Sequence, residues 1–181
     1  ALPADAHLPV ERMIARLNAA LRVRALHSIV LRRIEMAAEQ HQMPALSTED
    51  PLDDATVLIV GRGPLYPALS VAIGERVNMV GAFSVETAAT HLDTRNIDGV
   101  VIGDGLSPRM VEAFLTLLAE EPRFRDIPVA VIGDAPDDFG ETLVNIDHVS
   151  GDPVRLVPRM MPLVRLHAFE TRLKRMLATL D

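Results

Sequence analysis

The chain has 181 residues and a formal net charge of −7, and 49% of its residues are hydrophobic while 3% are aromatic. A chain of this length holds one domain of roughly 100–150 residues with extensions, and the hydrophobic share excludes intrinsic disorder. The lack of cysteine excludes disulfides and thiolate chemistry, the scarcity of aromatic residues argues against stacking on single-stranded nucleic acid, and the apolar runs are too short to cross a membrane. We therefore expect a cytoplasmic protein that binds neither nucleic acid nor membranes.

A long helix is predicted near the start of the chain. Pro9 ends any element before it, and neither glycine nor proline interrupts residues 10–40. Apolar residues recur at helical spacing, and we expect Leu17, Leu21 and Ile29 to be buried against the last helix of the chain. The helix is rich in arginine and the middle of the chain is acidic, so we expect its arginines to pair with the acidic body or with a partner.

Short apolar runs follow the first helix, and helical patterns alternate with them. The runs are residues 57–60, 77–80, 99–102 and 127–132, with a weaker fifth at 148–149. Strands without polar alternation are covered on both faces, as in a parallel sheet. The segments between the runs have helical periodicity, except that residues 137–144 could hold only a short helix. This alternation predicts a doubly wound α/β fold with right-handed crossovers.

The last segment is predicted to be helical to the end of the chain. Pro158 and Pro162 lie in its first turns, which predicts an early kink or a late helix start. Leucines then recur at spacings of three and four with one acid, Glu170, in the seam, which is a heptad pattern. Such a helix either packs on its own domain or pairs with another subunit, and a homodimer is expected. The candidate interface residues are Leu163, Leu166, Leu173, Leu177 and Leu180.

The order and length of the strands resemble the receiver domain of two-component response regulators over residues 55–167. The resemblance implies a five-stranded parallel sheet of order 2-1-3-4-5. In that family, an acidic pair after the first strand and an aspartate after the third bind magnesium, and that aspartate accepts the phosphoryl group. A serine or threonine after the fourth strand and a lysine before a proline sense the phosphate. These residues supply the hard oxygen ligands, the nucleophile and the cation that phosphoryl transfer requires.

None of these residue types stands at the corresponding positions of this chain. The pocket positions are occupied by Gly61, Arg62, Gly103, Gly133 and, directly before Pro153, Asp152. The resemblance therefore implies a vestigial pocket without a catalytic residue, a metal ion or a cofactor.

Two charged residues near this pocket allow other interpretations. Asp104 is adjacent to the acceptor position, but its side chain would point differently because strand residues alternate in direction, and we do not expect its phosphorylation. Arg62 would repel a magnesium ion, and it could replace the switch by pairing with Asp104, Asp134 or Asp152.

The beginning of the chain, Ala-Asp-Ala-His-Leu-Pro-Val at residues 4–10, resembles the end of another receiver. The whole chain is similar to the receiver–receiver part of PleD-type response regulators, whose second receiver is a degenerate adaptor and whose C-terminal domain makes cyclic di-GMP. On this resemblance, the chain is a non-enzymatic adaptor that cannot be phosphorylated. It would mediate dimerisation or transmit signals between neighbouring domains. The implied parts are the tail of a preceding receiver (1–40), a linker (41–54), a degenerate receiver (55–153) and a helix leading to a missing output domain (154–181).

Two short motifs favour other ligands. Gly61-Arg62-Gly63 could begin a dinucleotide fingerprint, although Tyr66 stands where the third glycine belongs, and a nucleotide- or small-molecule-binding domain is the alternative function. Residues 123–126, Arg-Phe-Arg-Asp, match the R-x-x-D pattern of cyclic di-GMP inhibitory sites. Receivers often carry an Arg-Asp pair before the fourth strand, so we expect a structural role for this motif.

Overall fold

The centre of the fold is a parallel sheet of five strands in the order β2-β1-β3-β4-β5. The computed structural model of the protein describes residues 10–39, 46–133, 139, 143, 145–149 and 152–180. The strands are β1 (Thr56–Val60), β2 (Asn78–Ala82), β3 (Gly99–Ile102), β4 (Val129–Ile132) and β5 (Ile146–Val149). The predicted strand order and the weak fifth strand are confirmed.

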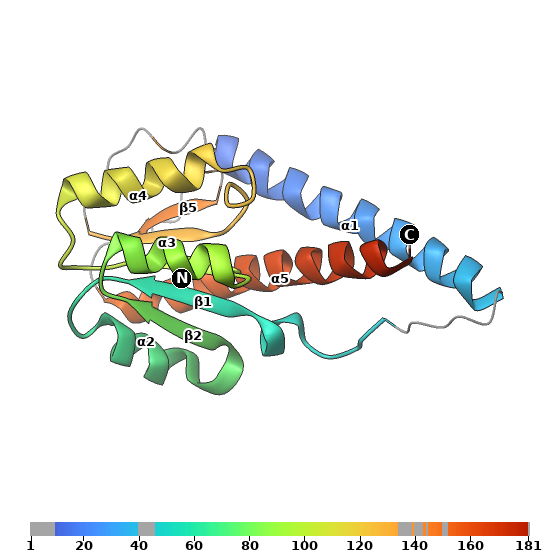
Figure 1. Cartoon of the computed structure of the whole chain (residues 1–181), viewed down its shortest axis with the longest axis horizontal. Coiled ribbons are helices and arrows are strands. Elements are labelled where there is room, and N and C mark those ends of the chain that lie inside the picture. Colours follow the sequence, from blue (N-terminus) through green and yellow to red (C-terminus); the bar gives the residue numbers. More distant parts are fainter. Residues whose placement is uncertain are drawn as a thin grey trace, which may run out of the picture.

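Helices cover both faces of the sheet (Figure 1). On one face lie α2 (Leu65–Ile73) and α5 (Val157–Leu180), and on the other lie α3 (Val85–Thr94) and α4 (Pro108–Glu120). The doubly wound fold is therefore as predicted. The short helix predicted at residues 137–144 lies largely outside the described residues.

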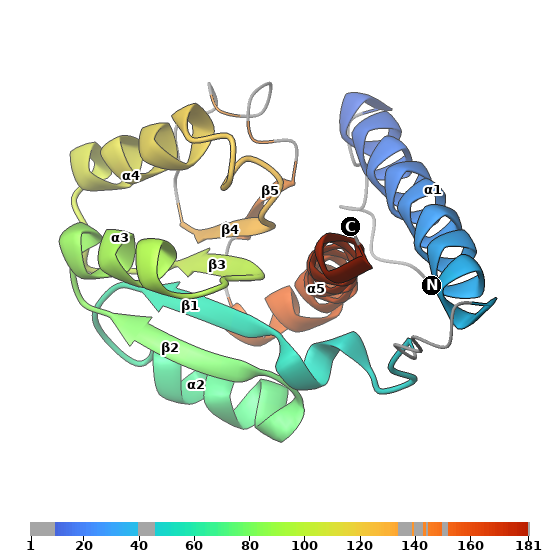
Figure 2. The ribbon, with the colours of Figure 1, turned by 45° about the vertical axis from the view of Figure 1, so that its right-hand side comes forward.

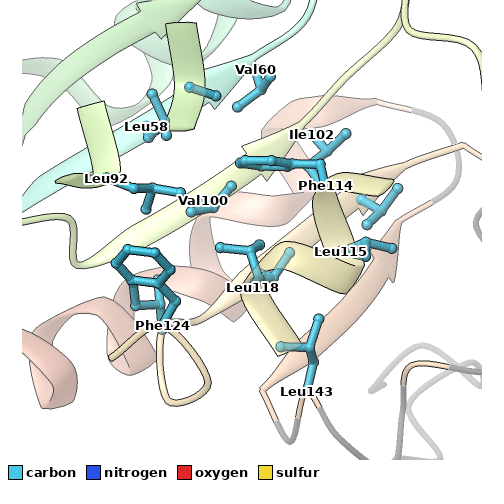
Figure 3. Close-up of a cluster of buried hydrophobic side chains, with 14 of the residues drawn as sticks. Leu58, Val60, Leu92, Val100, Ile102, Phe114, Leu115, Leu118, Phe124 and Leu143 are labelled. Carbon is cyan, nitrogen blue, oxygen red and sulfur yellow. The ribbon is translucent and has the colours of Figure 1, made fainter. Parts of the chain in front are cut away.

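The larger part of the core fills the space between the sheet and the pair α3 and α4 (Figure 3). Phe114 of α4 is fully buried there, against side chains that β1 and β3 direct to this face. Each buried side chain of this size stabilises the fold by about 1.5–3 kcal/mol. The neighbours labelled in Figure 3 are Leu58, Val60, Leu92, Val100, Ile102, Leu115, Leu118, Phe124 and Leu143.

On the opposite face, α5 lies close to the sheet because β3 begins with a glycine. A Cβ atom on Gly99 would lie 2.6 Å from Met160 Cε and 2.8 Å from Val164 Cγ2. A short 3₁₀ helix, Pro153–Leu156, precedes α5, so the predicted late helix start is confirmed. Pro162 lies within α5.

The first helix, α1 (Val10–Glu39), packs beside α5 and runs in the same direction (Figures 1 and 2). The long helix is confirmed. The centre of the contact is a fully buried cluster of Val23, Val30 and Leu173. Further apolar residues from both helices surround this cluster; they are Leu26, Ile34, Leu166, Phe169, Met176 and Leu177.

The prediction of which face of α1 is buried is wrong. Leu17, Leu21 and Ile29 are exposed, and the helix turns Val23 and Val30 toward α5 instead. The physical reason is that α1 has apolar residues on two sides, so its periodicity alone does not decide which side faces the partner helix. Among the described residues, no helix is both long enough and apolar enough to cross a membrane.

Charged side chains fix α1 to the acidic body, as predicted for its arginines. Arg16 donates to the Asp147 carboxylate of β5 at 2.9 Å. Arg22 donates to Glu170 of α5 at 3.2 Å and lies 3.3 Å from Asp126. Glu170 also lies 2.9 Å from the Lys174 ammonium and is almost fully buried. The acid predicted in the heptad seam is thus held between two cations.

Replacing this acid should destabilise the protein in a pH-dependent way. Burial raises the pKa of Glu170, but the hydrogen bonds from Lys174 and Arg22 outweigh that effect and hold its pKa below the ordinary value of 4.5. The stabilisation is therefore fully present above pH 4.5 and is lost as the pH falls through the folded-state pKa. We expect Glu170→Gln to lower the free energy of unfolding by about 1–3 kcal/mol at pH 7.

Urea unfolding at pH 7 and at a series of values below pH 4.5 measures this effect. The difference between the variant and the wild type should narrow in acid, whereas Glu112→Gln, at an exposed position of α4, should have little effect at any pH. If the free energy of unfolding of Glu170→Gln differs from that of the wild type by the same amount at every pH, the conclusion that Glu170 is ionised in the folded protein is contradicted.

The described part of the predicted linker packs against the rest of the domain. Its 3₁₀ helix, Pro51–Asp54, buries Leu52 in the core beside α5. Arg165 of α5 donates to Asp50 at 2.8 Å, and Arg172 donates to Asp54 at 3.0 Å. The connection between α1 and the sheet is therefore fixed along the side of α5.

Candidate functional site

The loops after β1 and β3 meet at the carboxyl edge of the sheet, where the vestigial pocket is predicted. Gly103 donates its N–H to the Val60 carbonyl at 2.8 Å, and Arg62 donates its N–H to the Asp104 carbonyl at 2.8 Å. The structure thus brings together the predicted residues of these two loops. Gly133 follows β4 at the same edge and donates to the Val149 carbonyl at 3.2 Å.

The space beside Gly103, the position predicted to correspond to the phosphoryl acceptor, is filled by a leucine. A Cβ atom on Gly103 would overlap Leu65 Cδ2 and lie 3.3 Å from Leu65 Cγ. Leu65 is the first residue of α2 and is buried. An apolar side chain therefore occupies the space that any side chain at position 103 would need.

The two loops also approach each other too closely for side chains at two further glycines. Gly61 has a φ of 146°, and a Cβ atom there would lie 2.8 Å from the Asp104 carbonyl oxygen. Gly105 has a φ of 87°, and its Cβ would lie 2.8 Å from Arg62 Cβ. These positions need glycine for both conformation and space. The two loops therefore pack directly on one another at these glycines.

Arg62 does not take over the switch through two of the three acids considered for it. Its side chain is exposed, and within the described part of the chain it forms no ion pair with Asp104 or Asp152. Asp134 lies outside the described residues. The backbone of Arg62, and not its guanidinium, joins the first loop to the third.

Asp152, at the position predicted to correspond to the phosphate-sensing lysine, has a structural partner. Its carboxylate accepts a hydrogen bond from the Val154 N–H at 2.9 Å, and it caps the 3₁₀ helix that begins with Pro153. A carboxylate at this place satisfies a helix amide that otherwise lacks a partner. The side chain thus serves the local backbone, and it adds no cation to the pocket.

The carboxyl edge does not gather metal ligands among the residues that the structure describes. No three His, Asp or Glu side chains of these residues are arranged to hold a metal ion. Asp104 is exposed, with glycine on either side of it.

The loop considered for nucleotide binding borders a small apolar cavity. The cavity has a volume of about 150 Å³, and its lining includes Gly61, Gly63, Tyr66 and Phe83. Ligand pockets usually measure roughly 300–1,000 Å³. Pro67, in the first turn of α2, also lacks the N–H that a phosphate group would use. The geometry therefore disfavours a dinucleotide at this loop.

The R-x-x-D motif is held within the fold. Arg123 donates to Glu121 and Asp93, both at 3.2 Å, and its guanidinium lies 5.0 Å from the Phe124 ring centroid. The Asp126 carboxylate lies 3.3 Å from Arg22 of α1. These contacts agree with the expected structural role.

A partly buried polar pair at the opposite edge of the sheet was not predicted from the sequence. His167 Nδ1 lies 3.0 Å from Asp98 Oδ1, and the other Asp98 oxygen accepts the Thr56 N–H at 3.1 Å. This pair joins α5 to the amino ends of β1 and β3. The signal in the sequence was an acid directly before a buried strand, but its histidine partner lies 69 residues away.

The predicted interface leucines are largely occupied within the chain. Leu166, Leu173 and Leu177 pack against α1, while Leu163 and Leu180 are partly buried. Pairing with a second subunit through the same leucines would require α1 to leave α5.

Comparisons with known proteins concern the fold. No protein-family model matches the chain, and no curated protein matches it. A solved structure of a response regulator from Chloroflexus aurantiacus J-10-fl is 18% identical with a TM-score of 0.51, over 61% of this chain and 98% of that one. A signal receiver domain of an HD domain-containing protein from Pseudomonas fluorescens Pf-5 is 15% identical with a TM-score of 0.46, over 75% and 96% of the two chains.

A third structure, the N-terminal domain of a response regulator receiver protein from Methanoculleus marisnigri JR1, is 22% identical with a TM-score of 0.44, over 52% and 82% of the two chains. The likeness to the Chloroflexus structure, together with the strand order, establishes a receiver-like α/β fold for this chain.

Proposed function

We propose that this chain is a non-enzymatic adaptor of a two-component-type signalling protein, and that it acts by contact and without phosphorylation. The observation that carries the proposal is the burial of Leu65 in the space of the acceptor carboxylate. The receiver-like fold supports a place in two-component signalling.

The chemistry of the pocket supports the lack of phosphorylation. Phosphoryl transfer to a receiver requires a divalent ion on oxygen ligands and a carboxylate nucleophile within its reach. Here glycines replace the nucleophile and one ligand position, and Arg62 adds a positive charge beside them. The close approach of the two loops also leaves no space for an acidic side chain at Gly61.

The paired helices are the part of the molecule suited to transmitting a signal. In Figure 1, α1 and α5 extend together beyond the end of the sheet. A helix of 30 residues, such as α1, is about 45 Å long. We expect the pair to hold neighbouring domains in a fixed relation, with an output domain after α5; a diguanylate cyclase is the specific candidate from the PleD-type resemblance. Because α1 covers Leu166, Leu173 and Leu177 of α5, contact between domains of one polypeptide is better supported than dimerisation through those leucines.

Treatment with acetyl phosphate or beryllofluoride in the presence of magnesium is therefore expected to leave the protein unchanged. Intact-mass spectrometry should detect no added mass, and the melting temperature should not shift. A phosphorylatable receiver domain treated in parallel provides the positive control, and Asp104→Asn provides the matched negative control. A magnesium-dependent adduct that disappears in Asp104→Asn would overturn the proposal and identify a working phosphoswitch.

A further inference from the structure

A cavity of about 320 Å³ lies at the amino edge of the sheet, opposite to the vestigial pocket. Its wall is formed by residues 92–97 before β3, by part of residues 123–127 before β4, and by the middle of α5. Open α/β sheets usually bind ligands at the carboxyl edge, but Leu65 and the closely packed loops fill that edge here. The cavity at the amino edge has the volume of a small-molecule pocket.

The wall of this cavity carries more positive than negative charge. Its lining includes Arg95, Arg123 and Lys174, and among the described lining residues the one acid is Asp93. Arg123 lies 3.2 Å from Asp93, and Lys174 lies 2.9 Å from Glu170, which is outside the lining. Arg95 has no such partner within the described part of the chain. An unpaired guanidinium can bind a phosphate or carboxylate group through two parallel hydrogen bonds.

Neutral polar side chains of the wall also lack partners. Thr90 and Thr116 donate to the carbonyl one helical turn back, at 3.0 and 2.9 Å, but Thr171 of α5 has no hydrogen-bond partner among the described residues. The side-chain amide of Asn96 has none among them either. Both side chains line the cavity, where a few polar groups of this kind would orient a ligand.

His167 lines the same cavity and is held in place by Asp98. Its Nδ1 lies 3.0 Å from Asp98 Oδ1, and the other oxygen of this carboxylate accepts the Thr56 N–H at 3.1 Å. This pairing leaves Nε2 as the ring nitrogen that can bond to a ligand. Nε2 accepts a hydrogen bond from a hydroxyl group when the ring is neutral, and it donates to an anion when the ring is protonated.

We propose that this cavity binds a small polar molecule that carries one phosphate or carboxylate group. Arg95 binds the anionic group, and the polar remainder of the ligand bonds to Asn96, Thr171 and His167 Nε2. A single anionic group matches the single unpaired guanidinium of the described lining, and a second one would be repelled by the Asp93 carboxylate.

The cavity is also placed to act on the two long helices. Lys174 in its wall pairs with Glu170, which accepts a hydrogen bond from Arg22 of α1 at 3.2 Å. Arg22 also lies 3.3 Å from Asp126, in the segment before β4 that forms another part of the wall. A bound ligand contacts α5 and this segment where α1 is attached, and it stabilises the arrangement to which it binds. Binding itself does not depend on the loss of phosphorylation, whereas its effect on α1 and α5 rests on the proposed function.

An NMR titration of residues 1–181 with inorganic phosphate and, separately, with acetate tests the site at constant ionic strength. We expect saturable shifts of the amide signals of residues 92–97 and of Thr171 with at least one anion, and that anion identifies the ligand class. Arg95→Gln should weaken the binding by about tenfold to hundredfold. The matched control is Arg109→Gln, at an exposed position in the first turn of α4, and it should leave the affinity unchanged.

The remainder of the ligand is tested with the hydroxylated counterpart of the anion that binds, glycerol 3-phosphate or glycerate. This probe should bind more tightly than the simple anion, Thr171→Val should reduce the difference, and hydrogen exchange in α1 and α5 should become slower. The absence of saturable shifts with both anions, or an equal loss of affinity in Arg95→Gln and Arg109→Gln, would overturn the proposal. Unchanged hydrogen exchange in the bound protein would overturn the action on the helices alone. None of these results bears on the acetyl phosphate test, so the two proposals can fail separately.

Discussion

Gly103→Asp, which restores the acidic residue type of the receiver acceptor, is expected to destabilise the protein by at least ~3 kcal/mol and to produce no phosphorylation. The new side chain would overlap Leu65, and overpacking of a core costs about 1–3 kcal/mol. The carboxylate would also lie at a buried position without a magnesium ion to neutralise it, which adds a penalty of several kcal/mol or forces its protonation. Chemical unfolding measures the loss of stability, and intact-mass spectrometry after acetyl phosphate treatment measures the reaction.

A double-mutant cycle with Leu65→Ala separates the overlap from the other effects. Leu65→Ala alone should destabilise the protein by about 2–5 kcal/mol because it leaves a cavity. If the leucine occupies the space that the aspartate needs, the double variant should be more stable than the sum of the single effects predicts, by at least ~1 kcal/mol. Additive effects would mean that Leu65 moves aside without cost and that the pocket is open rather than filled.

The sequence predicted the sheet well because its strands are apolar on both faces. Runs such as 57–60 and 99–102 lack polar alternation, and the structure covers both sides of β1 and β3 with helices. The boundaries of α1 were also predictable, because proline and glycine are absent over its length. These features depend on local sequence, which a single chain displays directly.

The burial of the helices was harder to predict, because it depends on partners that are distant in sequence. The periodicity of α1 indicates apolar residues on two sides, and it does not say that Val23 and Val30 face α5 while Leu17 faces outward. The pairing of His167 with Asp98 was not predicted for the same reason, because the two residues meet only when α5 packs on the sheet.

At the candidate site, the sequence predicted which side chains are missing and not what replaces them. The resemblance to receivers identified glycine at position 103, but it gave no reason to expect Leu65 in the space that remains. A signal was present, because Leu65 is the first apolar residue after the glycine-containing loop and begins a helix over the same edge. To predict that Leu65 fills this space, one would have to know the angle at which α2 packs on the sheet, and the sequence does not show that angle.

Leu173→Ala is expected to lower the free energy of unfolding by about 2–5 kcal/mol, whereas Leu17→Ala should change it by less than about 0.5 kcal/mol. Both variants remove the same atoms from a leucine in a long helix, but Leu173 is 1% exposed and Leu17 is 61% exposed. The first substitution leaves a cavity beside Val23 and Val30, and the second removes a side chain that water already surrounds. Urea unfolding of residues 1–181 measures both values.

The comparison of the two leucines decides whether α1 is an integral part of this domain. A large effect of Leu173→Ala, with faster hydrogen exchange throughout α1, means that the contact between the helices contributes to the global stability. Nearly equal small effects would mean that α1 detaches easily, and the pair of α1 and α5 would then not hold a neighbouring domain in place. A large effect of Leu17→Ala would mean that the outward face of α1 is covered in the folded protein, although no described residue covers it.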